Sequence, residues 1–97
     1  MNFDYSEKTL YRNEMCDVVH FPEKNKVETT IDGITAYVEY RIDGDTFNIT
    51  HTIVPKELGG KGLARILVTV AFTMAEEEGL KLKADCSYAK KWLEENR

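Results

Sequence analysis

The stretch Gly59-Gly60-Lys61-Gly62 has the residue types and the spacing to hold a phosphate group. It follows a strand-like run, residues 47–54, that ends at Pro55, and it precedes a long segment with helical spacing of apolar residues. Backbone N–H groups at a helix N-terminus lack intrahelical partners, and the helix dipole favours an anion there. Glycines let the backbone approach a ligand without Cβ atoms in the way. We therefore expect this glycine turn to bind a phosphate-bearing ligand.

Cys86 is the second residue that could do chemistry. It ends a short strand-like run and precedes Ser87, which we expect to be the N-cap of a final helix over residues 88–95. The positive end of a helix dipole lowers the pKa of a thiol and raises its thiolate fraction, which would make Cys86 a nucleophile. The alternative is a buried cysteine that acts as a small apolar residue, since it shares strand parity with Leu82 and Ala84.

Two further polar residues have two readings each. His51 is predicted on the same strand face as Phe47 and Ile49, where a histidine is either a hydrogen-bonded core residue or a general base. Lys61 either adds a charge contact to a phosphate or is an exposed lysine at a helix start. No spacing of His, Cys, Asp and Glu residues predicts a metal site.

The glycine turn and Cys86 are positioned by a predicted βαβ unit. Residues 47–54 form its first strand. Apolar residues at three- and four-residue spacing then predict a helix that begins at about Lys61 and that Gly79 ends as its C′ residue. Residues 80–85 form a second strand, which a right-handed crossover makes parallel to the first. Ligands of open α/β units bind outside the carboxyl ends of parallel strands. The turn and Cys86 should therefore lie on one rim of the sheet.

An antiparallel meander is predicted to precede this unit. Strand alternation begins at Lys26, and Asp32-Gly33 is typical of a type I′ hairpin turn. Residues 34–42 form the next strand, and a second turn at residues 43–45 leads into residues 47–54. Residues 1–25 are the least readable part: residues 16–21 predict a short strand that Pro22 ends, and we expect this segment to contribute an edge strand or a short helix.

Length and composition limit the class of protein. The 97 residues, 42% hydrophobic and 31% charged, predict one globular domain over residues 1–97. A net charge of −4 with no dense Lys/Arg cluster argues against nucleic-acid binding. No run of 18 apolar residues predicts a membrane span, and the charged N-terminus does not resemble a signal peptide. We expect a cytoplasmic protein in which Cys16 and Cys86 are reduced.

Three motifs together resemble the GNAT acyltransferase superfamily. The strand, turn and helix start from Val54 to Ala64 resemble its motif A, Arg/Gln-x-x-Gly-x-Gly/Ala, with Gly62 as the central glycine and Gly59 in place of Arg or Gln. His51-Thr52-Ile53-Val54-Pro55 and Cys86-Ser87-Tyr88 are similar to runs in a minimal group of roughly hundred-residue GNAT-like proteins. The likeness covers about three-quarters of the chain.

The resemblance implies a fold and a cofactor. The fold would be α/β (α+β): a mixed sheet in which an antiparallel meander is followed by a β-α-β unit with splayed parallel strands and a short C-terminal helix. Acetyl-CoA would lie between the splayed strands with its pyrophosphate on the turn. The residues expected to bind it are Val54, Gly59, Gly60, Lys61, Gly62, Leu63, Ala64 and Ser87.

The resemblance also implies a reaction with two routes. The Cys86 thiolate would accept the acetyl group and pass it on. Alternatively the transfer is direct, with a general base such as His51 and with Tyr88 protonating the leaving thiolate, although Tyr88 could instead be a packing residue.

The acceptor would be an amine or a thiol, on a small molecule or on a protein. Small open sheets often pair, so a homodimer is also considered. A hypothesis of a different class is a non-catalytic acyl-CoA-binding or protein-interaction module, which would keep the cofactor turn without turnover.

Overall fold

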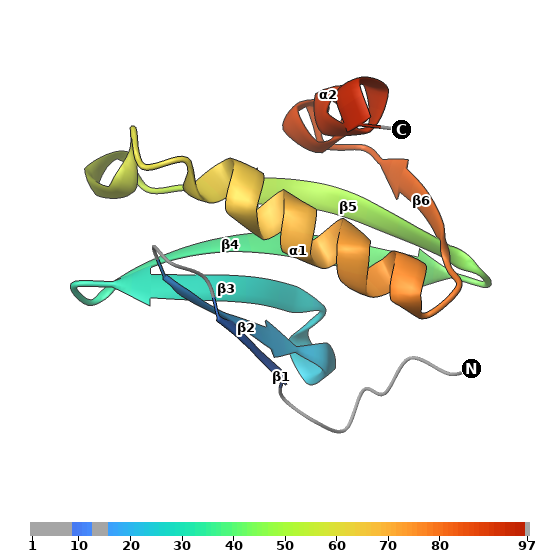
Figure 1. Ribbon diagram of the computed structural model, residues 1–97, viewed down its shortest axis with the longest axis horizontal. Coiled ribbons are helices and arrows are strands. Elements are labelled where there is room, and N and C mark those ends of the chain that lie inside the picture. Colours follow the sequence, from blue (N-terminus) through green and yellow to red (C-terminus); the bar gives the residue numbers. More distant parts are fainter. Residues whose placement is uncertain (1–8, 13–15, 97) are drawn as a thin grey trace.

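The described residues form a sheet of six strands in the order β1-β2-β3-β4-β5-β6 (Figure 1). The computed structural model describes residues 9–12 and 16–96. Neighbouring strands are antiparallel from β1 to β5, whereas β5 and β6 are parallel. The strands are β1 (Thr9–Arg12), β2 (Asp17–Phe21), β3 (Lys26–Ile31), β4 (Ile34–Asp43), β5 (Thr46–Ile53) and β6 (Lys81–Ala84). The predicted fold class, an antiparallel meander followed by a parallel βαβ unit, is confirmed.

The N-terminal segment adds two strands to the predicted meander. The strand expected at residues 16–21 is present as β2, and Pro22 ends it by opening a short 3₁₀ helix, Pro22–Lys24. The expected edge strand is β1, which pairs with β2 at the end of the sheet. The rest of the N-terminal segment, residues 1–8 and 13–15, lies outside the described part of the chain.

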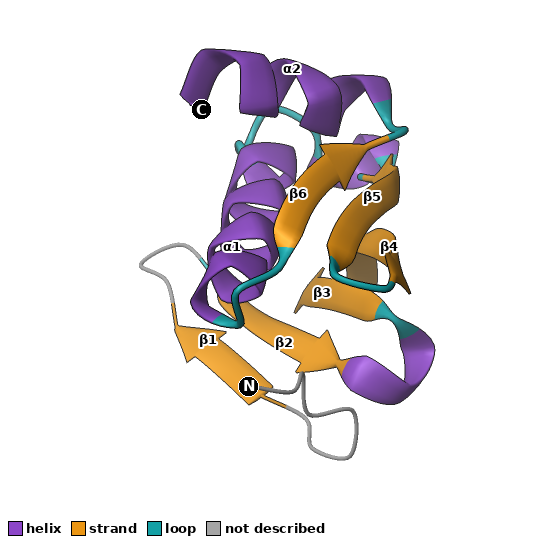
Figure 2. Cartoon of the chain, turned by 90° about the vertical axis from the view of Figure 1, so that its right-hand side faces the viewer, coloured by secondary structure: helices purple, strands orange, loops and turns teal. Residues whose placement is uncertain are grey.

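In the described part of the chain, two α-helices complete the fold: α1 (Leu63–Glu77) and α2 (Ser87–Asn96). Helix α1 packs against β3, β4, β5 and β6, and α2 packs against β6 and α1 (Figure 2). Gly79 follows the end of α1 with a φ of 77°, and its N–H donates to the Glu76 carbonyl, as the predicted C-terminal glycine should.

Aromatic rings run through the core between the sheet and the helices. Phe47 of β5 stacks on Tyr40 of β4 with ring centroids 4.4 Å apart, and its ring lies 6.1 Å from that of Phe72 in α1. Trp92 of α2 lies 5.2 Å from Phe72 and donates from Nε1 to the Thr69 hydroxyl. These contacts fix α2 against α1, which a ten-residue helix needs because it is unstable alone.

A register shift divides β5 into two halves. Tyr40 pairs with Ile49, but the preceding Glu39 pairs with His51, so Thr50 is an extra residue of a β-bulge. The bulge changes which side chains face inward. The predicted common face of Phe47, Ile49, His51 and Ile53 is therefore wrong beyond Ile49: Phe47 and Ile49 are buried, whereas His51 and Ile53 are exposed.

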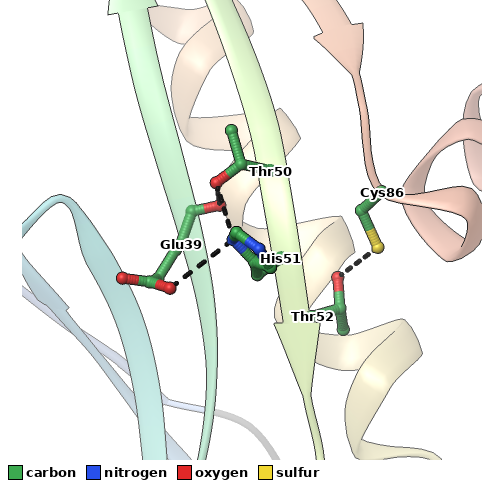
Figure 3. Close-up of polar contacts among 5 residues, drawn as sticks. All are labelled: Glu39, Thr50, His51, Thr52 and Cys86. Carbon is green, nitrogen blue, oxygen red and sulfur yellow. Dashed lines mark hydrogen bonds and ion pairs between the residues drawn. The ribbon is translucent and has the colours of Figure 1, made fainter.

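The parallel pairing of β5 with β6 stops at the same place. The paired register runs from Thr46 opposite Lys81 to Ile49 opposite Ala84 and goes no further. The Ile49 carbonyl accepts hydrogen bonds from the N–H groups of Asp85 and Cys86 at 3.0 and 3.1 Å. Beyond it, residues 51–53 of β5 pair with β4 only. The strands separate there, on the side of β5 where Thr52 and Cys86 lie (Figure 3). The glycine turn follows the end of β5 on the same rim.

Candidate functional site

The glycine turn leads from the end of β5 into α1. A short 3₁₀ helix, Lys56–Leu58, follows Pro55, and Gly60 and Gly62 then have φ values of 79° and 74°. Residues other than glycine rarely adopt such angles, so the turn depends on both glycines. Gly62 is the N-cap of α1, so the helix begins at Leu63, two residues after the predicted start.

The start of α1 leaves backbone donors free for an anion. Gly62 has no side chain to cap the helix, and no described side chain makes a cap hydrogen bond. The first N–H groups of α1, from Leu63 onward, therefore have no intrahelical acceptor and point out of the helix end. Leu63 is 2% exposed and Val54 is half-buried against the core, so these two side chains hold the turn in place. Lys61 is exposed and forms no ion pair with a described residue.

Cys86 occupies the N-cap position of α2. Its carbonyl accepts the first helical hydrogen bond, from the Lys90 N–H at 2.9 Å. The predicted N-cap, Ser87, is instead the first helical residue, so that prediction is one residue too late. The reason is that β6 ends early, at Ala84, once its pairing with β5 stops.

The Cys86 thiol is held by hydrogen bonds at this helix end. Its Sγ donates to Thr52 Oγ1 at 3.3 Å, across the gap between β6 and β5 (Figure 3). Burial of the thiol raises its pKa. The thiolate form instead accepts hydrogen bonds from the Thr52 hydroxyl and from the backbone of Ala89, Tyr88 and Thr52, and these outweigh burial, so the pKa of Cys86 is lowered. The expected direction of the pKa shift is confirmed. The alternative, a cysteine that acts as a small apolar residue, is also partly met, because Cys86 packs against the core as well.

Thr52 is the contact that sequence reasoning missed. Strand alternation without a bulge places Thr52 opposite the buried face of Phe47 and Ile49. The bulge at Thr50 reverses this, so Thr52 pairs with buried Val38 and turns its hydroxyl toward Cys86. A bulge has no reliable sequence signal of its own; the His-Thr-x-Val-Pro run marked the right segment but not the side chain.

His51 lies on the other side of β5 from Cys86. Its side chain is 64% exposed, and Nδ1 lies 3.6 Å from Glu39 Oε1 and 3.3 Å from Thr50 Oγ1. Figure 3 shows the imidazole turned toward Glu39 and away from the thiol. The reading of His51 as a core residue is wrong, and the structure does not bring it to Cys86.

Tyr88 lies close to Cys86 along the chain but is 41% exposed. It lines a groove between α1 and α2 instead of filling the core, so its reading as a packing residue is also wrong. Among the described residues, no three His, Cys, Asp or Glu side chains are grouped closely enough to hold a metal ion. In the same part of the chain, no helix has the length and apolar character needed to cross a membrane.

The fold and the site together define a class of protein. A glycine turn between a strand and a helix, beside parallel strands that separate at that end, is the arrangement expected of a small acyltransferase fold. The sequence model described as GCN5-related N-acetyl-transferase matches residues 26–97, and the chain belongs to this family. The GNAT-like resemblance drawn from the motifs is thus confirmed.

Two known proteins give the extent of the likeness. Protein NATD1 of Xenopus tropicalis is 37% identical over 51 residues, which are 53% of this chain and 47% of that protein, so the match spans about half of its length. An NMR solution structure of a GCN5-like protein from Staphylococcus aureus is 33% identical, with a TM-score of 0.61 over 90% of this chain and 78% of that one.

Proposed function

We propose that the protein binds acetyl-CoA and transfers its acetyl group to an amine or a thiol, with Cys86 as the first acceptor. One observation supports this above the others: the Cys86 thiol, with its lowered pKa, faces the gap where β6 leaves β5. The glycine turn lies on the same rim. Backbone N–H groups that can bind a phosphate and a thiol that can attack a thioester thus lie on one open edge of the sheet.

The residues of the turn and the gap suit a coenzyme A donor. Free N–H groups at the start of α1 would bind its pyrophosphate, with Gly59, Gly60 and Gly62 allowing close approach, Leu63 and Ala64 supplying N–H groups and Lys61 adding charge. The pantetheine arm contains two amides, and the edge of β5 past Ile49 has no partner strand among the described residues. This edge can bind an extended amide chain as a strand would. Val54 and the exposed Ser87 would lie on either side of the arm.

The transfer through Cys86 has two balanced steps. In the first, the thiolate attacks the thioester carbonyl; a new C–S bond forms, the C–S bond to coenzyme A breaks, and the coenzyme leaves as a thiolate that takes up a proton. In the second, the acceptor amine attacks the acetylated Cys86, a C–N bond forms, the amine loses a proton and the Cys86 thiolate leaves. Thr52 and the N–H groups of α2 stabilise the Cys86 thiolate both before it attacks the thioester and when it leaves in the second step.

In the direct route, other side chains would act as the acid and the base. Tyr88 would then protonate the leaving coenzyme thiolate, and the acceptor would attack the thioester without a covalent enzyme form. His51 could take a proton only from an acceptor that approaches its own side of β5, since it is turned away from Cys86.

Cofactor binding is tested by thermal unfolding with and without acetyl-CoA. We expect acetyl-CoA to raise the melting temperature and Gly62→Glu to remove this shift, because a carboxylate would face the pyrophosphate. Gly33→Glu is the matched control: Gly33 has a φ of 77° against 74° for Gly62, and neither has a neighbour within 4 Å of a built Cβ. Both variants carry the same backbone penalty, so only Gly62→Glu should lose the cofactor shift. An unchanged melting temperature of the wild type at saturating acetyl-CoA would contradict the proposal.

The covalent step is tested by intact-mass analysis after incubation with acetyl-CoA. One acetyl group should be added, Cys86→Ala should prevent it and Cys16→Ala should not. Full transfer to an acceptor by Cys86→Ala would overturn the Cys86 route in favour of direct transfer.

A non-catalytic acyl-CoA-binding module is the second candidate. The exposure of residues 59–62 and of Tyr88 favours it, because no described segment covers the acceptor side. A cofactor-dependent rise in melting temperature with neither an acetyl adduct nor transfer to any amine or thiol would support this candidate.

A further inference from the structure

A second groove lies beside the unpaired edge of β6, away from the glycine turn. Strand β6 pairs with β5 on one side, and no described strand pairs with it on the other (Figure 2). The volume of the groove is about 570 Å³, within the range of ligand sites. None of its lining residues belongs to β5, so it opens on the free side of β6. These residues are Glu76, Leu80, Lys81, Leu82, Leu93 and Glu94, and together they define the β6 groove.

The backbone of β6 offers hydrogen bonds along this edge. The N–H groups of Lys81 and Asp85 donate toward β5, at 2.7 and 3.0 Å. Backbone groups of successive residues in a strand point to opposite sides, so Leu82 and Ala84 direct theirs away from β5. An extended segment that pairs with these two residues would place every second side chain next to the groove.

The floor of the β6 groove is apolar. Leu80 and Leu82 of β6 and Leu93 of α2 pack against the core, and all three are only half-buried. The part of each leucine that the fold leaves uncovered faces one groove. The floor therefore suits one apolar side chain of a bound segment.

The border of the β6 groove is acidic. Glu76 lies in the last turn of α1, where a carboxylate opposes the helix dipole, so helix stability does not explain it. Glu94 of α2 is exposed and forms no ion pair with a described residue. Lys81 also lines the groove, but its Nζ lies 3.5 Å from Asp45 Oδ2, which offsets its charge. The groove therefore favours cations on either side of an apolar residue.

A second copy of the chain does not match this edge. Antiparallel pairing of two β6 strands centred on Leu82 would place Lys81 of each copy opposite Lys83 of the other. Like charges directly opposite each other destabilise a strand pair, and lysines on an edge strand are a common guard against such pairing. The occupant is therefore a segment that presents no cations beside Lys81 and Lys83.

We propose that the β6 groove docks an extended basic segment of another protein, which adds a strand to β6. The segment sets an apolar side chain on the leucine floor, with lysine or arginine side chains toward Glu76 and Glu94. Its main chain pairs with Leu82 and Ala84. The inference goes beyond the proposed acetyl transfer and does not rest on it, because the groove shares no residue with the glycine turn or with the gap beside Cys86.

Fluorescence polarisation with a labelled synthetic peptide and the full chain tests this. The peptide Thr-Lys-Thr-Leu-Thr-Lys-Thr has lysine and leucine on one strand face, and it reads the same in both directions, so it suits parallel and antiparallel pairing. We expect saturable binding. Replacement of both lysines by glutamate, or of the leucine by serine, should weaken binding about tenfold or more.

A charge reversal in the protein tests the acidic border. Glu94→Lys should lower the preference for the lysine peptide over the glutamate peptide by about tenfold. Glu95→Lys is the matched control, because Glu95 is exposed on the same helix but lines the groove of Tyr88 instead. The preference should stay as in the wild type in Glu95→Lys.

Two N-methylated peptides test the strand pairing. Amides of alternate residues point to opposite sides of a strand, so either those of lysine and leucine or those of threonine face β6. Methylation of one set should abolish binding, and methylation of the other should leave it nearly unchanged.

The proposal is wrong if the lysine peptide does not bind saturably, or if the glutamate peptide binds equally well. Equal effects of the two methylated sets, or of Glu94→Lys and Glu95→Lys, would also overturn it. Self-association of the chain that competes with the peptide would assign the groove to a second copy instead.

Discussion

Strand β5 is closed along its first half and open along its second. Residues 46–49 pair with β4 on one side and with β6 on the other, and Phe47 and Ile49 are completely buried. Residues 51–53 pair with β4 alone, and His51 and Ile53 are exposed. The change falls at one residue, Thr50, where the bulge in the β4–β5 pairing and the end of the β5–β6 pairing coincide.

The difference shows how a small fold combines stability with an open site. The closed half holds the aromatic core and fixes where β6 must end. The open half can then expose backbone and polar side chains without loosening the rest, because the bulge takes up the change in register locally. Each prediction below compares a residue of the closed half, or of its core, with a residue of the open half.

The largest difference is expected between Phe47→Ala and Ile53→Ala. Phe47 is completely buried and contacts the Tyr40 and Phe72 rings, so its truncation should lower the free energy of unfolding by about 3–5 kcal/mol. Ile53 is 40% exposed, and its truncation should cost about 1 kcal/mol or less. Urea unfolding of both variants measures this. Similar losses would mean that the open half is part of the core.

His20, buried against the core of the closed half of β5, should make the free energy of unfolding sensitive to acid. His20 is 3% exposed and bonded to the Tyr40 hydroxyl; burial lowers its pKa from 6.5 to about 4, and Glu23 only partly offsets this. The folded state thus resists protonation that the unfolded chain accepts. Its contribution is complete above about pH 6.5 and is lost as the pH falls toward 4, by about 3 kcal/mol in total.

Unfolding measured across this pH range for two substitutions tests that sign. His20→Gln should flatten the acid side of the stability profile, whereas Ile53→Ala, which removes no ionisable group from the open half, should keep its full slope. A profile that keeps its full slope in His20→Gln would show that other groups cause the acid loss.

The closed half of β5 is also the half that sequence predicts well. Alternation of apolar residues, the Asp-Gly turn and the glycines around α1 depend on local chemistry, and they placed the strands, the helices and the common rim of the turn and Cys86. The fold class followed from those elements because few connections between them are allowed.

The open half was predicted poorly for a physical reason. A bulge depends on how two strands share their hydrogen bonds, which residue types in one strand do not encode. Strict alternation therefore placed His51 inside and Thr52 outside. The helix starts at residues 63 and 87 were missed by two residues and by one, because the exact boundary depends on the cap geometry, which residue types alone do not fix.

An intermediate loss is expected at the boundary between the two halves. Asn48 is 5% exposed; its Nδ2 donates to Asp85 Oδ2 and its Oδ1 accepts from the Asp85 N–H, both at 3.0 Å. Asn48→Ala removes both bonds and leaves the Asp85 N–H with the Ile49 carbonyl alone, which should cost about 1–3 kcal/mol. Thr50→Ala, two residues further on, removes the hydroxyl contacts with the Glu39 carbonyl and with His51 Nδ1, both of 3.3 Å and both nearer the surface, and should cost less. If Thr50→Ala costs more, the bulge and not the Asn48–Asp85 pair holds the boundary.

The smallest effect on stability, and the most informative about chemistry, is expected from Thr52→Val. The substitution keeps the shape of the side chain but removes the hydroxyl that contacts the Cys86 thiol, so the pKa of Cys86 should rise while stability changes by about 1 kcal/mol or less. The pH dependence of alkylation in a Cys16→Ala background reports the thiol alone. Thr52→Ser should restore the wild-type profile, and Thr50→Val, on a hydroxyl that bonds Glu39 instead, should not alter it.

The result decides which half of the rim activates the thiol. A raised pKa in Thr52→Val assigns the activation to the open half of β5, and hence to the bulge that turns Thr52 toward β6. An unchanged pKa assigns it to the N–H groups of Tyr88 and Ala89, which any helix of this length would offer to an N-cap cysteine. In that case the gap between the strands would let the acetyl donor reach Cys86 but would not change the pKa of its thiol.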